Sequence, residues 1–393
     1  MTKHARWIDT PGGVREVAER LRQCDVIALD TEFIRETTFF PKIALIQLAT
    51  ADEAWLLDPV KLDRDAMAPV LDVLTDTRVL KILHAAFADQ ECLYWAYGVV
   101  AEPVFDTAVA AALCGIGDNA GLAKLLKEVC RVHLPKGRAR VKWLTRPLPT
   151  ELMHYAEQDV AHLVELGLSL QSRMDRLGRR EWALTESRIE ASAFDVTPEE
   201  AAFRMARGGS LDAVGYAVLA ELVRWRDGRA KQADLPRAWV AGNEVLISLA
   251  KVRPDSLSEL KSFRGLSAKE LDRHGDRLLA SIRRGLEDPS PALPQLPKNP
   301  PPPSENEDHA LILIRTYLAY LGARFEVAPR LLLGSGRAYE LFLASGLGTE
   351  EWVRLGILGR YSADLIGEEL EAFLCGRRAL TLRDGKVEIL TYR

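Results

Sequence analysis

The sequence predicts an α/β domain followed by two all-α domains, and three features of the chain support this. Short apolar runs alternate with helical patterns up to about residue 180, which is typical of a sheet covered by helices. Residues 211–287 and 309–374 then show helical patterns without intervening strands. A proline-rich stretch, residues 289–303, separates these two segments and is typical of an extended linker.

The composition is that of an ordinary soluble protein. The 393 residues allow two or three domains, and 48% of them are apolar and 27% are charged. The 52 Lys and Arg residues against 56 Asp and Glu give a formal net charge of −4. This net charge does not by itself indicate a nucleic-acid-binding protein. It does not exclude one either, because phosphate binding needs only a local basic surface.

Cysteine usage and the lack of long apolar runs indicate a cytoplasmic protein. The five cysteines are widely spaced, with no CxxC pair and no nearby histidine suited to zinc. The first residues contain no apolar signal segment, and no run approaches the roughly 18 to 20 apolar residues of a membrane span. We therefore expect a reduced, cytoplasmic compartment and no membrane partner.

The chain is organised around residues 26–33, VIALDTEF. The first four of these are continuously apolar, which is typical of a strand buried on both faces. Asp30 and Glu32 share one side of this strand, because strand side chains repeat every second residue. Two close carboxylates repel and are costly to bury unless a cation neutralises them, so the pair indicates a divalent metal. Taken alone, the pair also fits a strand that ends in a solvated turn.

The other elements of the first domain follow in order. A helix is predicted over residues 10–23 from apolar positions at helical spacing, and strands over residues 43–49 and 54–57. A third apolar run, residues 79–83, ends shortly before Asp89, which begins another helical pattern. An acid at a helix start is favoured by the helix dipole alone, so Asp89 has a structural as well as a functional interpretation.

A late helix carries a further acid. Residues 136–146, KGRARVKWLTR, form a basic loop with one aromatic residue, and such charge runs are usually solvated connections. The loop leads into a helical pattern over residues 150–170, in which Tyr155 and Asp159 lie one turn apart on one face. Two helices are also predicted before the loop, over residues 106–113 and 120–129. Four carboxylates thus stand at the ends of elements that one sheet could bring together.

Three of these segments together resemble a known family. The run DTEFIRETTFFPKIALIQLA, the HxxxxD pattern from His84 to Asp89 and YAEQDV at residues 155–160 are similar to the three exonuclease motifs of the tyrosine-bearing (DEDDy) branch of the DEDD superfamily. The first motif resembles bacterial ribonuclease D in particular. The resemblance implies an RNase H-like domain, with a mixed sheet flanked by helices, and a 3′–5′ exoribonuclease that releases 5′-mononucleotides.

The helical segments resemble the domains that accompany this exonuclease. ELVRWRDGRAKQADLPRAWVAGNEVLISLA and LSELKSFRGLSAKELDRHG are similar to the HRDC domain that ribonuclease D shares with RecQ-type helicases. The segment around RYSADLIGEELEAFLCGRRALTL is similar to the second helical domain of that family. We therefore expect an exonuclease domain, a connecting segment, an HRDC domain, a proline-rich linker and an HRDC-like domain over residues 1–180, 181–209, 210–288, 289–305 and 306–393.

The resemblance also implies a role for each acid. Asp30, Glu32 and Asp159 would hold a first ion with its water, and Asp30 would bridge to a second ion that Asp89 supports. Tyr155 would orient the attacking water by a hydrogen bond. Carboxylate oxygens suit Mg²⁺ or Mn²⁺, and a pair of such ions can activate the water and stabilise the leaving 3′ oxygen.

The implied substrate is RNA with a free 3′ end, such as a tRNA precursor. We expect substrate contacts from a stacking aromatic, the motif histidine, the basic loop and an aromatic among basic residues of the HRDC domain, namely Phe33, His84, Lys136, Arg140 and Trp225. Alternatively, Trp225 belongs to the core and the charges around it form a solvated helix face. The helical domains are expected to raise affinity for RNA and to leave the chemical step to the first domain of a monomer.

Other interpretations stay open on the sequence alone. One is an exonuclease of the same chemistry that acts on DNA, which the HRDC resemblance disfavours. Another is an inactive RNA-binding module, which the presence of all four acids and Tyr155 disfavours, and a purely structural protein has less support still. One departure lies before the third motif, where Lys142 precedes Trp143 in place of the acidic residue that family members usually have. This departure bears on substrate preference and leaves the metal-binding acids unchanged.

Overall fold

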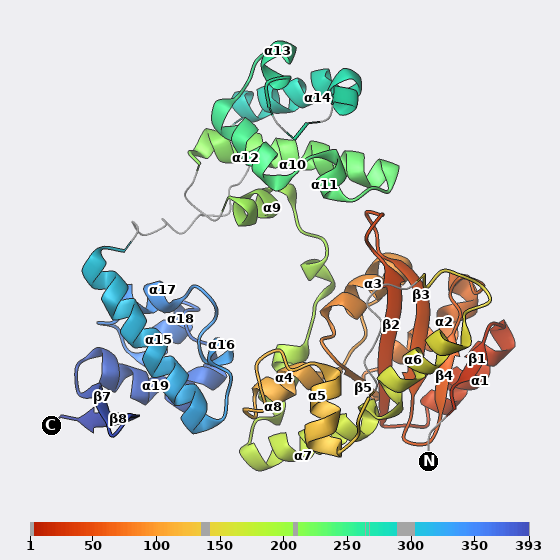
Figure 1. Ribbon diagram of the computed structural model, residues 1–393, viewed down its shortest axis with the longest axis horizontal. Helices are drawn as coiled ribbons and strands as arrows, with labels where there is room; N and C mark the ends of the chain where they lie inside the picture. The colour runs from red at the N-terminus through yellow and green to blue at the C-terminus, as the bar shows by residue number, and fades with distance from the viewer. Residues whose placement is uncertain are drawn as a thin grey trace.

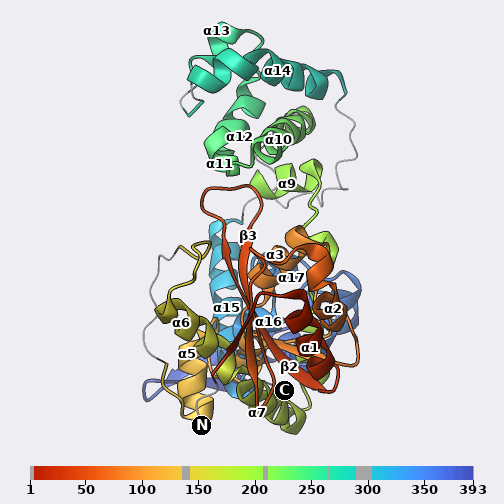
Figure 2. The same cartoon turned by 90° about the vertical axis from the view of Figure 1, so that its right-hand side faces the viewer.

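The computed structural model describes residues 4–134, 142–206, 211–263, 265–266, 268–288 and 303–392. Figure 1 shows an α/β body in red to yellow, a green helical body above it and a blue helical body at its side. The view in Figure 2 again places the green body beyond the upper end of the sheet. In the described part of the chain, no helix is both long and apolar enough to cross a bilayer.

The first body is built on a mixed sheet. Within the described residues the strand order is β1-β4-β3-β2-β5-β6; β3 is antiparallel to both of its neighbours, and the other pairs are parallel. The strands are β1 (Arg6–Ile8), β2 (Val26–Ile34), β3 (Lys42–Ala49), β4 (Ala54–Leu57), β5 (Leu80–Leu83) and β6 (Val104–Asp106). The apolar start of β2 is buried between two strands and two layers of helices, which explains why it lacks alternation.

Two groups of helices cover the two faces of the sheet. The group on the face to which Leu29 points consists of α1 (Pro11–Leu21), α2 (Arg64–Leu74) and α3 (Phe87–Tyr97). The group on the face of Ala28 consists of α4 (Thr107–Ala112), α6 (Thr150–Ala161) and α7 (Leu163–Leu177), with α5 (Leu122–Leu125) and the π-helical turn η1 (Leu126–Cys130) beside them. Since Asp30 and Glu32 follow Ala28 at every second residue, they point toward this second group.

The helix predicted over residues 150–170 is in fact two helices, because the chain breaks at His162. As a result α6 crosses β2, β3 and β4, whereas α7 lies over β2 and β5. The approach of α7 depends on Gly167, where an added Cβ would lie 2.0 Å from Cδ1 of Ile82 on β5. The break therefore places α6, with its acid, over the polar end of β2.

The remaining elements form a connecting segment and two helical bodies. The connection consists of α8 (Arg180–Ser187) and the 3₁₀ turn η2 (Ala191–Ala193). The first helical body consists of α9 (Pro198–Met205), α10 (Ala213–Ala233), α11 (Arg237–Val240), α12 (Asn243–Val252), α13 (Leu257–Leu260) and α14 (Ala268–Glu287). The second consists of α15 (Glu305–Phe325), α16 (Pro329–Leu332), α17 (Ala338–Leu343), α18 (Thr349–Arg354), α19 (Arg360–Leu374) and the hairpin β7 (Arg378–Arg383) and β8 (Lys386–Thr391).

The second helical body shares a hydrophobic core with the α/β body. Buried residues of α4 and α7 belong to the same cluster as those of α15 and α19. At this junction the Arg179 guanidinium donates to the carbonyls of Leu113 (2.7 Å) and Phe325 (2.6 Å), one on each side. Ala328 N–H also donates to the Ala112 carbonyl (2.8 Å). Buried apolar contact and paired backbone groups therefore hold these two bodies together.

The first helical body contacts the α/β body through the loop between β2 and β3. Asp234, which ends α10 in a left-handed conformation, accepts hydrogen bonds from the backbone N–H groups of Phe39 (3.1 Å) and Phe40 (3.4 Å). It also pairs with Lys42 (2.8 Å). The Phe39 ring is buried beneath the guanidinium of Arg237, which lies 4.3 Å from the ring centroid. The β2–β3 hairpin, whose first strand carries Asp30 and Glu32, thus contacts the first helical body at its loop.

Candidate active site

Three carboxylates meet on the face of the sheet that α6 covers. Asp30 and Glu32 come from β2, and Asp159 comes from α6; one oxygen of each lies within 4.8 Å of the others. The period of the strand fixes the first two on one side, and the break at His162 brings the third above them. The geometry is that of a site for a cation with oxygen ligands.

Asp89 approaches the same site from the other layer. It lies in the first turn of α3 and is only 7% exposed. Its Oδ1 accepts hydrogen bonds from the backbone N–H (3.0 Å) and the hydroxyl (2.6 Å) of Thr31, the residue between the two β2 acids. Asp89 is therefore held against β2 at the edge of the carboxylate group rather than at its centre.

Burial is the largest cause of a raised pKa at each of the four carboxylates, and nearby acids add to it. Burial, and then the charges of Asp89, Asp159 and Glu32, raise the pKa of Asp30 well above its ordinary value. Burial followed by neighbouring acids raises the pKa of Glu32 to about 8 and that of Asp159 to about 7. Burial raises the pKa of Asp89 to about 6, against the hydrogen bonds from Thr31 that lower it.

No basic side chain within the described ranges forms an ion pair with any of these four acids. Buried carboxylates without a counter-charge are costly, because desolvation and mutual repulsion add. Four oxygen donors with no sulfur or imidazole among them suit a hard divalent ion such as Mg²⁺ or Mn²⁺. The residues present therefore fit the metal site that the sequence pattern predicts.

Tyr155 lies one turn before Asp159 on α6 and is half-buried beside the acids. Burial, and then the charges of Asp159, Glu32 and Asp30, raise the pKa of the phenol to about 12. The hydroxyl consequently keeps its proton at neutral pH and is able to donate a hydrogen bond toward the carboxylates or a water near them. The buried ring of Trp143 packs against it, with 6.0 Å between centroids, and limits its movement.

Two supporting residues are not evident in the sequence pattern. Gln47 lies directly opposite Asp30 in the β2–β3 ladder, is fully buried, and donates from Nε2 to Oδ2 of Asp30 (3.2 Å). Its Oε1 has no partner among the described residues. Thr31 holds Asp89 as described above. A polar residue in the apolar run IALIQLA is the signal that identifies Gln47 once the strand register is known.

Arg146 anchors the described end of the basic loop. Its guanidinium makes two hydrogen bonds to Asp58 (2.8 and 2.7 Å), whose side chain is fully buried. It also donates to the carbonyl of Ala44 (2.6 Å), which sits where the β2–β3 register shifts, and to that of Trp143 (2.8 Å). Arg146 thus ties the irregular part of β3 to the residue that packs on Tyr155.

The expected substrate contacts have mixed surroundings. Phe33 is half-buried just after the register shift in β2, two residues beyond Thr31. The Nδ1 of His84 lies 2.9 Å from the Thr107 hydroxyl, and burial lowers the pKa of this histidine. Trp225 is half-buried and packs against the cores of the first helical body. Lys136 and Arg140 lie outside the described residues.

The basic residues near Trp225 are engaged within the protein. Arg226 is buried and pairs with Asp227 (2.8 Å) and Asn243 (2.7 Å). Arg224 and Arg237 form ion pairs as well, with carboxylates of α9, α10 or both. The expected cluster of RNA-binding arginines around Trp225 is therefore largely a set of internal ion pairs, while Trp239 is 59% exposed.

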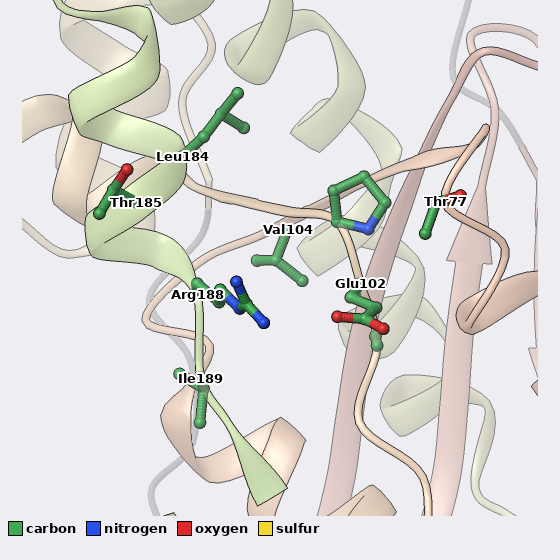
Figure 3. Close-up of a pocket in the computed structure, with 9 residues that line it drawn as sticks. Thr77, Glu102, Val104, Leu184, Thr185, Arg188 and Ile189 are labelled. Atoms are coloured by element: carbon green, nitrogen blue, oxygen red, sulfur yellow. The ribbon is translucent and has the colours of Figure 1, made fainter.

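A cavity of about 330 Å³ is lined by residues other than the acids (Figure 3). It opens at the start of β6, between the chain at Glu102 and Pro103 and the end of α8 at Arg188. Asp30 and Glu32 lie in β2 beyond the part that pairs with β5, and Asp89 follows the carboxyl end of β5, whereas the cavity opens at the start of β6. None of the predicted site residues lines this cavity, so its size does not make it the active site.

Comparison with known proteins agrees with this geometry. The family model described as "3'-5' exonuclease" matches residues 5–175, and the model described as "HRDC domain" matches residues 216–282. A curated ribonuclease D of Bartonella henselae is 30% identical over 371 residues, which cover 93% of this chain and 89% of the relative. Ribonuclease D of Escherichia coli is 34% identical over 290 residues, covering 73% of this chain and 76% of the relative.

A solved structure is similar over nearly the whole chain. The crystal structure of Escherichia coli RNase D, described as an exoribonuclease involved in structured RNA processing, superposes with a TM-score of 0.78 at 28% sequence identity. The match covers 95% of this chain and 99% of that one. The order of an exonuclease domain and helical domains is thus common to both proteins.

Proposed function

The chain belongs to the ribonuclease D family, and from that premise we propose that it removes nucleotides from RNA 3′ ends at the group of acids on β2, α3 and α6. The observation that carries this proposal is the meeting of Asp30, Glu32 and Asp159 within 4.8 Å in a partly buried place, with no counter-charge from the described residues. Such an arrangement has no structural benefit, because it destabilises the folded protein until a cation binds. It is explained by the chemistry that the cation permits.

Each side chain has a distinct part in the proposed reaction. Asp30, Glu32 and Asp159 would hold one divalent ion, and Asp89, kept against Thr31, would contribute with Asp30 to a second. The ions, Mg²⁺ or Mn²⁺, would lower the pKa of a bound water and neutralise charge that develops on the scissile phosphate. Gln47 fixes the orientation of the Asp30 carboxylate by its hydrogen bond, as partners of metal ligands commonly do.

Tyr155 would orient the attacking water. Its phenol keeps its proton at neutral pH, since burial and the neighbouring acids raise its pKa to about 12. A protonated hydroxyl beside Asp159 can donate to the water oxygen and leave a lone pair directed at phosphorus. The packing of Trp143 against the ring restricts the positions that this hydroxyl samples.

The proposed substrate is RNA with a free 3′ end, with tRNA precursors as the physiological class and 5′-mononucleotides as the product. The Escherichia coli relative is described as acting in structured RNA processing, which supports this choice. Phe33 and His84 remain the proposed contacts to the terminal nucleotide. Lys136 and Arg140 keep their proposed role at the phosphates on the strength of the sequence alone.

The experiment that tests this uses RNA and DNA oligonucleotides of identical sequence, labelled at either end. Full-length protein should release mononucleotides from the 3′ end of RNA in Mg²⁺ or Mn²⁺ and none in EDTA. Equal cleavage of DNA would favour the DNA exonuclease instead, because the 2′-hydroxyl is the group by which a ribonuclease tells RNA from DNA. Release from the 5′ end, or full activity in EDTA, would refute the proposal.

We propose the domain limits given by the sequence, with α9 of the predicted connecting segment packed on α10 in the first helical body. The helical domains are proposed to raise affinity for structured RNA. The shared core limits how this is tested. Removing residues 306–393 would expose buried residues of α4 and α7, so a truncated chain would lose activity through unfolding as well as through lost RNA contacts. Point substitutions on the surface of the helical domains test the idea more cleanly.

A further inference from the structure

An open cavity of about 420 Å³ is lined by residues of α8 and of the second helical body, and none of the four acids lines it. Figure 1 shows where α8 and this body lie in the fold. Its walls come from the side of α8, from the end of α16 with the loop that follows, and from the first turn of α19. Among its lining residues are three arginines, Arg330, Arg337 and Arg360, and one carboxylate, Glu186. In a chain with a net charge of −4, this is a local concentration of positive charge.

Two of the three guanidiniums are not neutralised. Arg330 pairs with Asp118 of the α/β body, and Glu186 accepts a hydrogen bond from the indole of Trp182 (3.2 Å). Arg337 and Arg360, both exposed, form no ion pair with any carboxylate in the described part of the chain. This distinguishes them from the arginines of α10, which are engaged within the protein.

The position of Arg360 is unfavourable for the fold itself. It is the first residue of α19, a helix of 15 residues whose first turn contains no acid and whose Gly359 cap has no side chain. The N-terminal end of a helix carries partial positive charge and unpaired N–H groups, so a cation there is destabilising and an anion is favoured. A residue choice that opposes local stability is the kind that a bound ligand explains.

An aromatic surface adjoins the two arginines. Tyr361, which follows Arg360 in the chain, is 36% exposed and stacks on the buried ring of Trp182, with 5.8 Å between centroids and 14° between planes. The buried tryptophan comes from α8, so the stack also fixes the two bodies around the cavity. A rigid, partly exposed ring beside unpaired guanidiniums suits a nucleotide, whose base stacks while its phosphate pairs.

We propose that this arginine pocket, formed by Arg337, Arg360 and Tyr361, binds the phosphate backbone of RNA at a distance from the 3′ end under cleavage. The inference rests on the proposed function, because it takes the occupant to be a part of the substrate. It explains how the second helical body contributes to RNA binding even though the arginines of the first are paired internally. The guanidiniums of Arg337 and Arg360 can pair with phosphates without breaking an existing ion pair.

The test compares two full-length double variants. In R337A/R360A both pocket arginines are removed; in R354A/R383A two exposed arginines of the same body are removed, which pair with Glu351 and Glu388 outside the pocket. Both variants lose the same charge, and none of the four residues is placed in the catalytic machinery. Thermal melting checks that both fold.

Each variant is assayed on a hairpin RNA with a single-stranded 3′ tail and on a tetranucleotide too short to reach the pocket. For R337A/R360A we expect KM for the hairpin RNA to rise about tenfold with kcat unchanged. The slope of log affinity against log salt concentration should fall by about one to two, which corresponds to the loss of about one to two phosphate contacts. Hydrolysis of the tetranucleotide should match the wild type. The control variant should show neither change.

Other outcomes would overturn the inference. If the two variants share the same KM and salt dependence on the hairpin RNA, the pocket does not bind the RNA backbone. If inorganic phosphate protects the wild type from melting more than R337A/R360A while KM for RNA is unchanged, the pocket binds free phosphate instead. Failure of the wild type to degrade either RNA from its 3′ end would refute the proposed function, and fluorescence anisotropy of uncleaved RNA would still report on the pocket.

Discussion

The carboxylates of the α/β body and the arginines of α10 are both dense groups of charge, but they have opposite surroundings. Asp30, Glu32 and Asp159 lie together in a partly buried place, where desolvation and neighbouring acids raise the pKa of each. On α10, by contrast, Arg226 is buried against Asp227, and Arg224 lies between two glutamates. The density of charge is similar, so it does not distinguish the two regions.

The difference is compensation. Charged side chains that are paired within the protein are not available to a ligand unless the pair breaks. At the surface such pairs contribute little to the free energy of unfolding. Charges that are buried without a partner destabilise the fold, and they persist only where a ligand completes them. Uncompensated charge is therefore the property that supports the proposed site at the acids. The proposed arginine pocket shares the lack of a partner among the described residues, although Arg337 and Arg360 are exposed.

The largest expected effect follows from removing one uncompensated acid. Asp30→Asn should lower kcat by at least about a thousandfold, since it deletes the ligand proposed to serve both metal ions. RNA binding, measured by fluorescence anisotropy, should stay within about twofold because the contacts to RNA are elsewhere. Asp52→Asn, in the exposed turn between β3 and β4, is the matched control. Hydrolysis by Asp30→Asn at the wild-type rate would show that the acids are not the active site.

A buried pair that is compensated should behave differently, with its main effect on stability. Arg146→Ala removes the ion pair of the fully buried Asp58 carboxylate, which within the described chain keeps only the Val60 N–H as a donor, and removes the guanidinium from the carbonyl of Ala44. We expect the free energy of unfolding to fall by about 3 to 5 kcal/mol, as is usual when one partner of a buried ion pair is removed. Chemical denaturation measures this.

The control for Arg146 is an arginine with an equally short but exposed pair. Arg78→Ala breaks its contact to Asp76 (2.7 Å), where the arginine side chain is 83% exposed. That change should stay within about 1 kcal/mol. If Arg146→Ala is no worse than Arg78→Ala, the anchor does not hold the loop. Because Trp143 packs on Tyr155, kcat should also fall in Arg146→Ala at temperatures where it remains folded.

The alignment of the candidate site residues within one element can be predicted from the sequence because it depends on short-range patterns. The period of a strand is enough to put Asp30 and Glu32 on one side, and the period of a helix is enough to align Tyr155 with Asp159. The mixed sheet flanked by helices and the helical domains that follow are confirmed as well. The motif order then fixes which elements belong together.

The sequence fails where a contact joins distant segments. Gln47 supports Asp30 only because of the β2–β3 register, and the pairing of Arg224 with Glu199 joins residues of two different helices. No local pattern reports either contact. The break at His162 is equally hidden, since the apolar spacing continues through it. Contacts between distant segments thus determine which charged residues have a partner of opposite charge. They distinguish the arginines of α10 from the acids of the α/β body.

The uncompensated acids also predict how stability depends on pH in the metal-free protein. Burial raises the pKa of Glu32 to about 8 and that of Asp159 to about 7, whereas in the unfolded chain both titrate near their ordinary values. The folded state therefore holds protons that the unfolded state releases. Stability is highest below about pH 4 with respect to these groups and falls as the pH rises toward 8.

Thermal melting in EDTA between pH 5 and pH 8 checks this. We expect a loss of about 2 kcal/mol or more over that interval, and a shallower loss in Glu32→Gln, which cannot ionise at this position. Saturating Mg²⁺ should remove most of the dependence, because a bound ion stabilises the ionised carboxylates. A profile in EDTA that is flat, or that rises with pH, would mean that the acids are compensated in solution.

The smallest effect is expected where the charge is paired at the surface. Arg224 forms ion pairs with Glu199 and Glu221. Glu221 also pairs with Arg284 (2.8 Å), so it keeps a cationic neighbour when Arg224 is removed. Arg224→Ala should therefore change unfolding free energy by less than about 1 kcal/mol and KM for hairpin RNA by less than about twofold. A rise in KM as large as that of R337A/R360A would show that RNA displaces Glu199 and Glu221 from Arg224. Compensation within the free protein would then not predict which arginines meet the substrate.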